Sequence, residues 1–407
     1  MLSFEQALES ILGEISTADT EHCELGSSGH RVLAGDVMAN TDVPPFDNSS
    51  MDGYALNAAE TSAASADHPV ELFVSGEVGA GDMPAGNVDR GTAARIFTGG
   101  PPPPGADSVI EQEMVHRSGD RIILRIPVSK GRNVRSRGED IARGAVALQK
   151  GLALTAARQG VLASLGVARV LVCKIPQIAI LTTGNELVDV HESLTPGKIR
   201  DSNSFTLSSL VRDAGCTPTV IGRASDSAND LREKIRMGLS GNALITSGGA
   251  SVGDRDLVIG VLKELGVEIR FWKVNIKPGM PFAFGVYSNR GEESAVPVFI
   301  LPGNPVSTMV TFLKLVRPAL SKMRGLKEES HYRLRARLEH DYEKQDGKRH
   351  FVRGILRNKT GELLVRSTGS QSSGVLTSLA LADCLITIPE ETKFVEAGSL
   401  VEVEPLI

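Results

Sequence analysis

Three polar loops in the middle of the chain combine residue types that suit the binding of a phosphate group. They span residues 182–186, 246–256 and 302–305, and each follows a short apolar run that is typical of a strand. Ligands of an open parallel sheet bind beyond the carboxyl ends of its strands, so the three loops are expected to meet at one edge. The middle loop is rich in Gly and Ser, which let main-chain N–H groups approach an anion closely. Considered alone, a plain glycine-rich turn explains that loop equally well.

Two acids, Asp254 and Asp256, close the middle loop. Carboxylates repel a bare phosphate unless a cation lies between them, and Mg²⁺ prefers carboxylate and phosphate oxygens as ligands. The loop therefore indicates a phosphate site assisted by Mg²⁺, with acidic helix caps as the alternative.

Further charged residues could serve the same chemistry. Lys273 and Lys277 flank an apolar run, and their spacing predicts that both lie on one face of a strand. Two cations on one face suit a substrate with several negative charges, although a pair of solvated lysines is the commoner explanation of such a pattern. Glycine-rich loops in the first half hold Asp52 and Asp140, which could bind a metal or cap the main chain.

Composition limits the classes of function. The chain has 407 residues, of which 41% are hydrophobic and 23% charged, and this length suits about two to four globular domains. A net charge of -5 and an aromatic content of 4% argue against nucleic acid or an anionic membrane as the main partner. The four cysteines show no C-x-x-C spacing, and no apolar run reaches the roughly 18 residues of a membrane span. We therefore expect a cytoplasmic protein without disulfides.

Apolar periodicity predicts the elements of the first half. Residues 4–15 are expected to form an amphipathic helix that begins with a capping box at Ser3 and Gln6. Residues 30–150 show short apolar runs with frequent Gly and Pro, which predicts β structure with elaborate loops. Four consecutive prolines at 101–104 must form a stiff loop, because proline cannot pair within a central strand.

The second half of the chain shows two different sequence patterns. Strands and helices alternate from residue 176 to about 325, which predicts an α/β unit with a parallel sheet that is covered on both faces. Short apolar runs split by turns then predict a small sandwich or barrel. These runs are 334–338, 351–352, 363–365, 385–388 and 400–403.

Taken together, the polar loops resemble those of the molybdopterin molybdenumtransferase (MoeA) family, to which the E domain of gephyrin also belongs. They occur in the family's order and extend over most of the chain. The matching stretches are 43–55, 96–99, 137–141, 181–187, 201–203, 247–253, 276–279 and 301–305.

The resemblance implies an elongated subunit of four parts, which is an α/β plus β architecture. It also implies an antiparallel homodimer, with a cleft between the α/β domain of one subunit and the inserted domain of the other. The implied parts are a MogA-like α/β domain (1–22 with 176–325), a mixed linking domain (23–45 with 141–175), an inserted β-rich domain (46–140) and a C-terminal β-barrel (326–407).

The resemblance further implies the reaction: Mg²⁺-dependent insertion of molybdate into adenylylated molybdopterin, with release of AMP, in molybdenum cofactor biosynthesis. Implied partners are the adenylyltransferase and proteins that assemble molybdoenzymes. The implied catalytic residues are Asp52, Asp140, Glu186, Asp226 and Asp256, with Glu186 and Asp256 as metal ligands. The implied substrate contacts are Thr98, Thr183, Gly184, Asp201, Ser202, Asn203, Ser247, Gly248, Gly249, Ser251, Gly253, Lys273, Lys277, Pro302, Asn304, Arg349 and Ser373.

Three positions depart from the family pattern, and two other functions stay open. Met280 stands where many relatives carry Lys, Asn185 replaces a frequent Asp, and Arg200 replaces a frequent aromatic residue. One alternative is the molybdopterin adenylyltransferase, which shares the α/β core but is much shorter than this chain. The other is a pterin carrier or scaffold without catalysis, which would not need the acid set.

Overall fold

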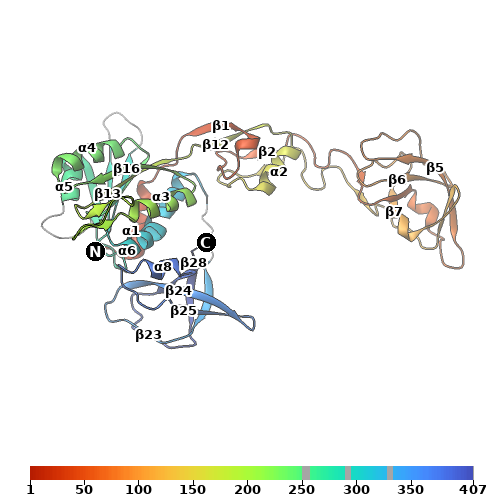
Figure 1. Ribbon diagram of the computed structural model, residues 1–407. Coiled ribbons are helices and arrows are strands. Elements are labelled where there is room, and N and C mark those ends of the chain that lie inside the picture. The colour runs from red at the N-terminus through yellow and green to blue at the C-terminus, as the bar shows by residue number, and fades with distance from the viewer. Residues whose placement is uncertain (250–256, 289–294, 328–332, 407) are drawn as a thin grey trace.

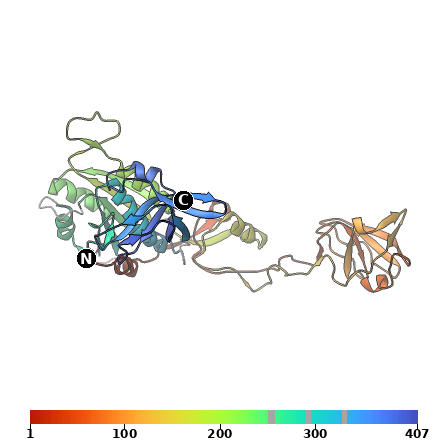
Figure 2. The ribbon, with the colours of Figure 1, turned by 90° about the horizontal axis from the view of Figure 1, so that it is seen from below.

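The computed structural model shows an elongated subunit (Figure 1). A helix-covered sheet and a β-barrel lie together at one end, a thin arm follows, and a separate β-rich unit lies at the other end. The same separation is visible from below (Figure 2). The structure describes residues 1–249, 257–288, 295–327 and 333–406. Within these ranges, no helix is both long and apolar enough to cross a membrane.

The sheet at the first end has six strands, most of them parallel. β13 pairs in parallel with β16 and β17, and β17 pairs in parallel with β21, as the alternation of strands and helices predicted. The strand order is β16 (Thr217–Ala224), β13 (Gln177–Thr183), β17 (Ala243–Ser247), β21 (Val296–Leu301), β20 (Ala283–Tyr287) and β18 (Val267–Trp272).

One strand of this sheet corrects the prediction of a purely parallel sheet. β20 runs antiparallel to both of its neighbours, β18 and β21. Short connections join it to each of them, whereas parallel neighbours need a crossover of a dozen or more residues. The sequence prediction placed no strand at Ala283–Tyr287 and expected a single strand region over 267–276 instead.

Side chains of β13 show how both faces of the sheet are covered. Ile178 and Ile180 belong to one buried core, whereas Ala179 and Leu181 belong to the other, as alternation along a strand requires. Helices α1 (Phe4–Glu14), α3 (Asn203–Asp213), α6 (Pro305–Thr311) and α7 (Arg317–Met323) and the π-helical turn η4 (Phe312–Val316) pack on the first face. Helices α4 (Ala228–Gly238) and α5 (Leu257–Glu264) pack on the second.

The predicted start of α1 is confirmed. The Ser3 hydroxyl accepts from the N–H of Gln6, and the Gln6 side chain accepts from the N–H of Ser3, which completes the capping box. Ala7 and Ile11 are fully buried against the sheet, so the apolar face of the helix is the one that periodicity predicted.

The arm is built from two chain segments that lie side by side. A small core that includes Leu33, Leu162 and Val172 holds it together. Its elements are β1 (Thr20–Glu24) paired with β12 (Arg169–Cys173), β2 (Val37–Met38) paired with β11 (Val146–Leu148), the turn η1 (Leu25–Ser27) and helix α2 (Ala156–Ser164).

The far unit is β-rich, as predicted, and the prolines at 101–104 lie in a loop. Its six-stranded sheet has the order β7 (Ser108–Glu111), β4 (Gly53–Leu56), β6 (Thr92–Ile96), β5 (Val70–Val78), β9 (Arg121–Leu124) and β8 (His116–Ser118). The pair β3 (Asn48–Ser49) and β10 (Val134–Arg135) and the turns η2 (Ala58–Thr61) and η3 (Gln112–Met114) complete it.

The C-terminal unit is a closed barrel, because β24 pairs with β26 as well as with β25. All five predicted strands are present: β22 (Leu334–Leu338), β24 (Arg349–Lys359), β25 (Glu362–Ser367), β26 (Cys384–Ile388) and β28 (Leu400–Pro405). Short elements around them are β19 (Ile276–Lys277), which pairs with β24, β23 (Tyr342–Glu343), β27 (Phe394–Val395) and helix α8 (Thr377–Ala380).

Candidate active site

A cavity of about 570 Å³ lies at the carboxyl ends of the parallel strands. The loops after β13, β17 and β21 all line it, together with the start of α3 and the ladder of β14 (Leu187–Val188) and β15 (Ile199–Arg200). The expected site residues that line it are Thr183, Gly184, Glu186, Asp201, Ser202, Asn203, Asp226, Ser247, Gly248, Gly249, Pro302 and Asn304. Ser251, Gly253 and Asp256 lie outside the described residues.

Two glycines form a cradle whose shape depends on the absence of a side chain. Gly248 and Gly249 have φ of +95° and +81°, in the left-handed region that favours glycine. A Cβ on Gly248 would lie 2.8 Å from the carbonyl oxygen of Thr183, and one on Gly249 would lie 2.4 Å from the Cβ of Val258. The main chain can therefore approach a bound group closely here, which is what a phosphate cradle requires.

A buried polar network holds the start of α3 against the sheet. The Thr182 hydroxyl donates to one carboxylate oxygen of Asp201 at 2.8 Å, and the other oxygen accepts from the N–H of Ser204 at 3.1 Å. Asp201 is only 5% exposed, so these two bonds occupy a carboxylate that has little access to solvent. Asp201 thus positions the helix start that lines the cavity.

Asn203 lines the cavity and has a buried acceptor atom without a partner among the described residues. Its Nδ2 donates to the Ser247 hydroxyl and to the carbonyl oxygen of Gly303, both at 2.8 Å. Its Oδ1 is buried and has no hydrogen-bond partner among the described residues. An unpaired buried acceptor costs about 1–3 kcal/mol. A ligand that carries N–H donors would relieve this cost.

Two carboxylates stand at the rim of the cavity. Glu186 packs against Gly184, where an added Cβ would lie 2.6 Å from the carboxylate oxygens. Asp226 and Asn185 are joined reciprocally, since the N–H of Asp226 donates to Asn185 Oδ1 at 3.1 Å and the N–H of Asn185 donates to Asp226 Oδ2 at 3.4 Å. The amide at Asn185 thus avoids a second negative charge beside Asp226.

These donors fit Mg²⁺. No group of three His, Cys, Asp or Glu side chains with metal-binding geometry occurs among the residues that the structure describes. Mg²⁺, however, is usually bound by one or two carboxylates together with substrate phosphates and water. Glu186, one of the two metal ligands expected from the sequence, places a carboxylate in the cavity lining together with the phosphate cradle, and Asp226 adds a second acid there.

The barrel contributes a loop to the rim. Asn304 Nδ2 donates to the hydroxyl of Ser373 at 3.1 Å, and the Ser373 carbonyl accepts from the N–H of Val306 at the start of α6. Arg353, which is 1% exposed, holds this loop by donating to the carbonyl oxygens of Ser370 and Ser372. The sequence analysis missed Arg353. A charged residue within the otherwise apolar stretch 351–356 was the available signal.

Lys277 and Arg349 lie at the contact between the sheet and the barrel rather than in the cavity lining. Lys277 pairs with Asp346 at 3.2 Å, and Arg349 pairs with Glu5 and with Glu390. Burial opposes ionisation of Asp346, but hydrogen bonds from its neighbours, Lys277 among them, lower its pKa to about 2. Both expected anion contacts thus have acidic partners within the chain.

The prediction that the two lysines share one strand face is wrong. β18 ends at Trp272, and Lys273 has φ of +76°, which turns the main chain before β19 begins at Ile276. Lys273 instead places its ammonium over the Trp272 ring at 5.6 Å. Alternation along a strand therefore does not relate Lys273 to Lys277.

Asp52 and Thr98 lie together in the far β-rich unit. Both the N–H and the hydroxyl of Thr98 donate to one oxygen of Asp52, at 2.8 and 2.7 Å. Asp140 follows β10 in the chain, and its N–H donates to the carbonyl of Val43. Within one chain the unit stands at the far end of the arm from the cavity (Figures 1 and 2). One subunit therefore does not bring Asp52 to Glu186.

The Thr98 bonds allow a prediction about pH. The N–H of Thr98, and then its hydroxyl, lower the pKa of Asp52 below 3.8. The stability that this carboxylate contributes is present above its unfolded pKa and is lost as pH falls through the folded pKa. Thr98→Val removes only the hydroxyl, so we expect the Asp52 pKa to rise part of the way toward 3.8.

An NMR titration of the Asp52 carboxyl carbon measures this change. Thr92→Val is the matched control, because the Thr92 hydroxyl donates to the carbonyl of Asp89 and not to Asp52. An Asp52 pKa that stays the same or falls in Thr98→Val would contradict the assignment.

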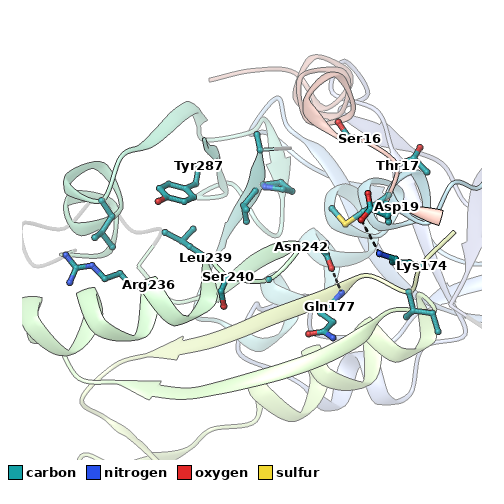
Figure 3. Close-up of a pocket in the computed structure, with 18 of the residues that line it drawn as sticks. Ser16, Thr17, Asp19, Lys174, Gln177, Arg236, Leu239, Ser240, Asn242 and Tyr287 are labelled. Atoms are coloured by element: carbon teal, nitrogen blue, oxygen red, sulfur yellow. Dashed lines mark hydrogen bonds and ion pairs between the residues drawn. The ribbon is translucent and has the colours of Figure 1, made fainter. Parts of the chain in front are cut away.

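A larger cavity, of about 910 Å³, lies at the opposite, amino ends of the strands (Figure 3). Asp19 and Lys174 form an ion pair of 3.2 Å there, and Asn242 accepts from the N–H of Gln177. The described residues that line this cavity include none of the expected site residues and form no glycine cradle comparable to Gly248 and Gly249. The smaller cavity is therefore the candidate active site.

Comparisons with known proteins identify the family of the chain. Family models match along the chain: the MoeA N-terminal region (domain I and II) at residues 2–166, a probable molybdopterin binding domain at 179–322, and the MoeA C-terminal region (domain IV) at 335–406.

Individual relatives match over nearly the full length. A curated protein of Haemophilus influenzae named molybdopterin molybdenumtransferase is 35% identical, with 100% of this chain and 98% of that protein covered. One of the same name from Nostoc is 35% identical over 94% of this chain and 88% of its own length. The crystal structure of the molybdopterin biosynthesis moeA protein from Pyrococcus horikoshii OT3 is 32% identical, with a TM-score of 0.86 and full coverage of both chains. The chain therefore belongs to the molybdopterin molybdenumtransferase (MoeA) family.

Proposed function

We propose that this chain inserts molybdate into adenylylated molybdopterin in a Mg²⁺-dependent reaction that releases AMP. The observation that carries the proposal is the cavity at the carboxyl ends of the strands. It combines a glycine cradle for a phosphate, an unpaired buried acceptor at Asn203 and two rim carboxylates. A diphosphate joined to a pterin, with its anionic bridge and N–H donors, matches all three features.

Residues at different positions of the cavity would have different roles in this reaction. Gly248 and Gly249 would hold the pterin phosphate through the main chain, and Asn203 would accept an N–H of the ligand. Glu186, with Asp256 as the second ligand expected from the sequence, would hold Mg²⁺, which supplies Lewis-acid charge for diphosphate cleavage. Asp226 would orient the attacking water or molybdate from the rim.

The proposal includes a homodimer. Asp52 and Thr98 stand on a unit that is remote from the cavity of their own chain. An antiparallel partner would bring its own Asp52 and Asp140 to this cavity, and the cleft between the two copies would unite the acid set. A twofold arrangement gives two equivalent clefts. We also propose that the subunit has four parts, formed by residues 1–22 with 176–325, 23–45 with 141–175, 46–140 and 326–407.

The proposal also covers the localisation of the enzyme and its partner proteins. We infer a cytoplasmic enzyme that receives its substrate from the adenylyltransferase and passes its product to proteins that assemble molybdoenzymes. The acidic net charge of -5 supports the inference that nucleic acid is not a partner.

The direct test supplies purified protein with adenylylated molybdopterin, Mg²⁺ and molybdate. We expect AMP release and metal insertion, both lost when Mg²⁺ is chelated. Consumption of ATP with free molybdopterin would instead identify an adenylyltransferase. Tight pterin binding without turnover would identify a carrier.

A further inference from the structure

A third cavity, of about 240 Å³, lies where the arm meets the amino ends of the sheet. The arm supplies residues 29–32 and 173–175, and the α/β unit supplies Arg212, residues 215–217 and Arg324. Lys174 and Ile175 also line the larger cavity shown in Figure 3, so the two cavities adjoin. The candidate active site is at the other end of the strands.

This cavity has a strongly basic lining. Its basic side chains are His30, Arg31, Lys174, Arg212 and Arg324, and none of its described lining residues is Asp or Glu. Arg31 and Lys174 each pair with one carboxylate from outside the lining, Glu21 and Asp19. The side chain of Arg212 makes no hydrogen bond or ion pair in the part of the chain that the structure describes. Among the described residues, the basic side chains at this junction thus outnumber the carboxylates that pair with them.

Arg324 is held in place before any ligand binds. Its guanidinium donates to the carbonyl oxygens of His30 at 2.8 Å and Ala214 at 3.0 Å. It stacks against Gly215, where an added Cβ would lie 2.3 Å from the guanidinium carbon and where φ is +71°. A side chain at position 215 would displace the guanidinium, so the observed position of Arg324 depends on glycine there.

The side chain of Arg31 has a buried N–H donor without a hydrogen-bond partner among the described residues. Its side chain is 13% exposed and donates to the carbonyl oxygen of Cys173 at 2.8 Å. Its Nε is fully buried and unpaired within the described residues. A buried donor without a partner carries a desolvation cost of about 1–3 kcal/mol, and the same side chain lines the cavity.

We propose that this cavity binds a doubly charged tetrahedral oxyanion of the phosphate type. Its volume equals that of about eight liquid waters, which admits such an ion with part of its hydration shell. Arginine and lysine donors are the usual partners of phosphate oxygens. Because the arm and the α/β unit both line the cavity, the bound anion would tie the arm to the sheet.

Isothermal titration of inorganic phosphate into the full chain at constant ionic strength tests the proposal. Arg212→Gln is the informative variant, because Arg212 is exposed and its loss breaks no bond within the described structure. Arg212 also lies in the last turn of α3, where its positive charge stabilises the helix dipole. The melting temperature of each protein is therefore measured without phosphate first, and the effect of phosphate is taken relative to that value. Arg236→Gln, on α4 and in the larger cavity, removes the same charge elsewhere.

We expect phosphate to bind the unaltered protein and Arg236→Gln alike, and the dissociation constant to rise about tenfold or more in Arg212→Gln. Phosphate is expected to raise the melting temperature of the unaltered protein and of Arg236→Gln alike, and that of Arg212→Gln by less. Titration with AMP separates the sources: binding that is lost in Arg212→Gln indicates a phosphomonoester, whereas binding of phosphate alone indicates the free ion. No binding at millimolar phosphate, or equal binding by all three proteins, would overturn the proposal.

Discussion

Glu186→Gln is expected to reduce the rate of molybdenum insertion by about 100- to 1000-fold while molybdopterin binding persists. The substitution keeps the size of the side chain and removes its negative charge from the rim of the cavity. The expected loss is large because Glu186 would hold the cation that neutralises the diphosphate. Single-turnover AMP release and pterin binding, measured separately, distinguish catalysis from carriage.

Glu233→Gln is the matched control for this experiment. Glu233 is exposed on α4 and does not line the cavity, so the same charge change there should leave the rate unchanged. A Glu186→Gln protein that releases AMP at the unaltered rate would rule out an essential role for this carboxylate.

Gly248→Ala is expected to reduce pterin affinity by about 10- to 100-fold and to lower stability by about 2 kcal/mol. A Cβ at Gly248 meets the Thr183 carbonyl at 2.8 Å, and the position also requires φ of +95°. The collision is with main chain, so the end of β13 must move and the cradle must open.

Gly260→Ala provides the contrast. Gly260 lies in α5, where an added Cβ meets nothing within 4 Å. Alanine there should be neutral or stabilising by up to about 1 kcal/mol, because alanine favours the helix. Pterin binding and thermal melting of both variants test the cradle. Equal behaviour of the two would show that the cradle does not bind the pterin.

Local sequence signals predicted much of the fold correctly. The capping box at Ser3 marked the start of α1, and the alternation of Ile178 and Ile180 with Ala179 and Leu181 reflects a strand buried on both faces. All five barrel strands were placed from short apolar runs. These signals are local because capping and alternation depend only on residues close in the chain.

Features that depend on distant contacts were not predictable in this way. The antiparallel direction of β20 is set by its neighbours β18 and β21 rather than by its own residues. The strand expected over 267–276 is interrupted at Lys273, because the turn at this position requires a left-handed main-chain conformation. The partners of Lys277 and Arg349, Asp346 and Glu390, come from the barrel and could not be read from spacing.

The candidate site shows the same division. The loops that meet at the carboxyl ends of the strands follow from parallel topology, which the alternation of elements predicted. The unpaired oxygen of Asn203 and the support of the Ser373 loop by Arg353 depend on side-chain packing between distant segments. The family resemblance, which the comparisons confirm, came from the order of many loops rather than from any one of them.

The central claim is that acids from two copies of the chain complete one active site, and mixed dimers test it most directly. Asp52→Asn and Glu186→Gln copies are co-expressed with different tags, and dimers that carry both tags are purified. If the sites form between subunits, each mixed dimer has one unaltered site and should show about half of the unaltered activity, although both parent variants are inactive. A mixed dimer as inactive as its parents would contradict the account.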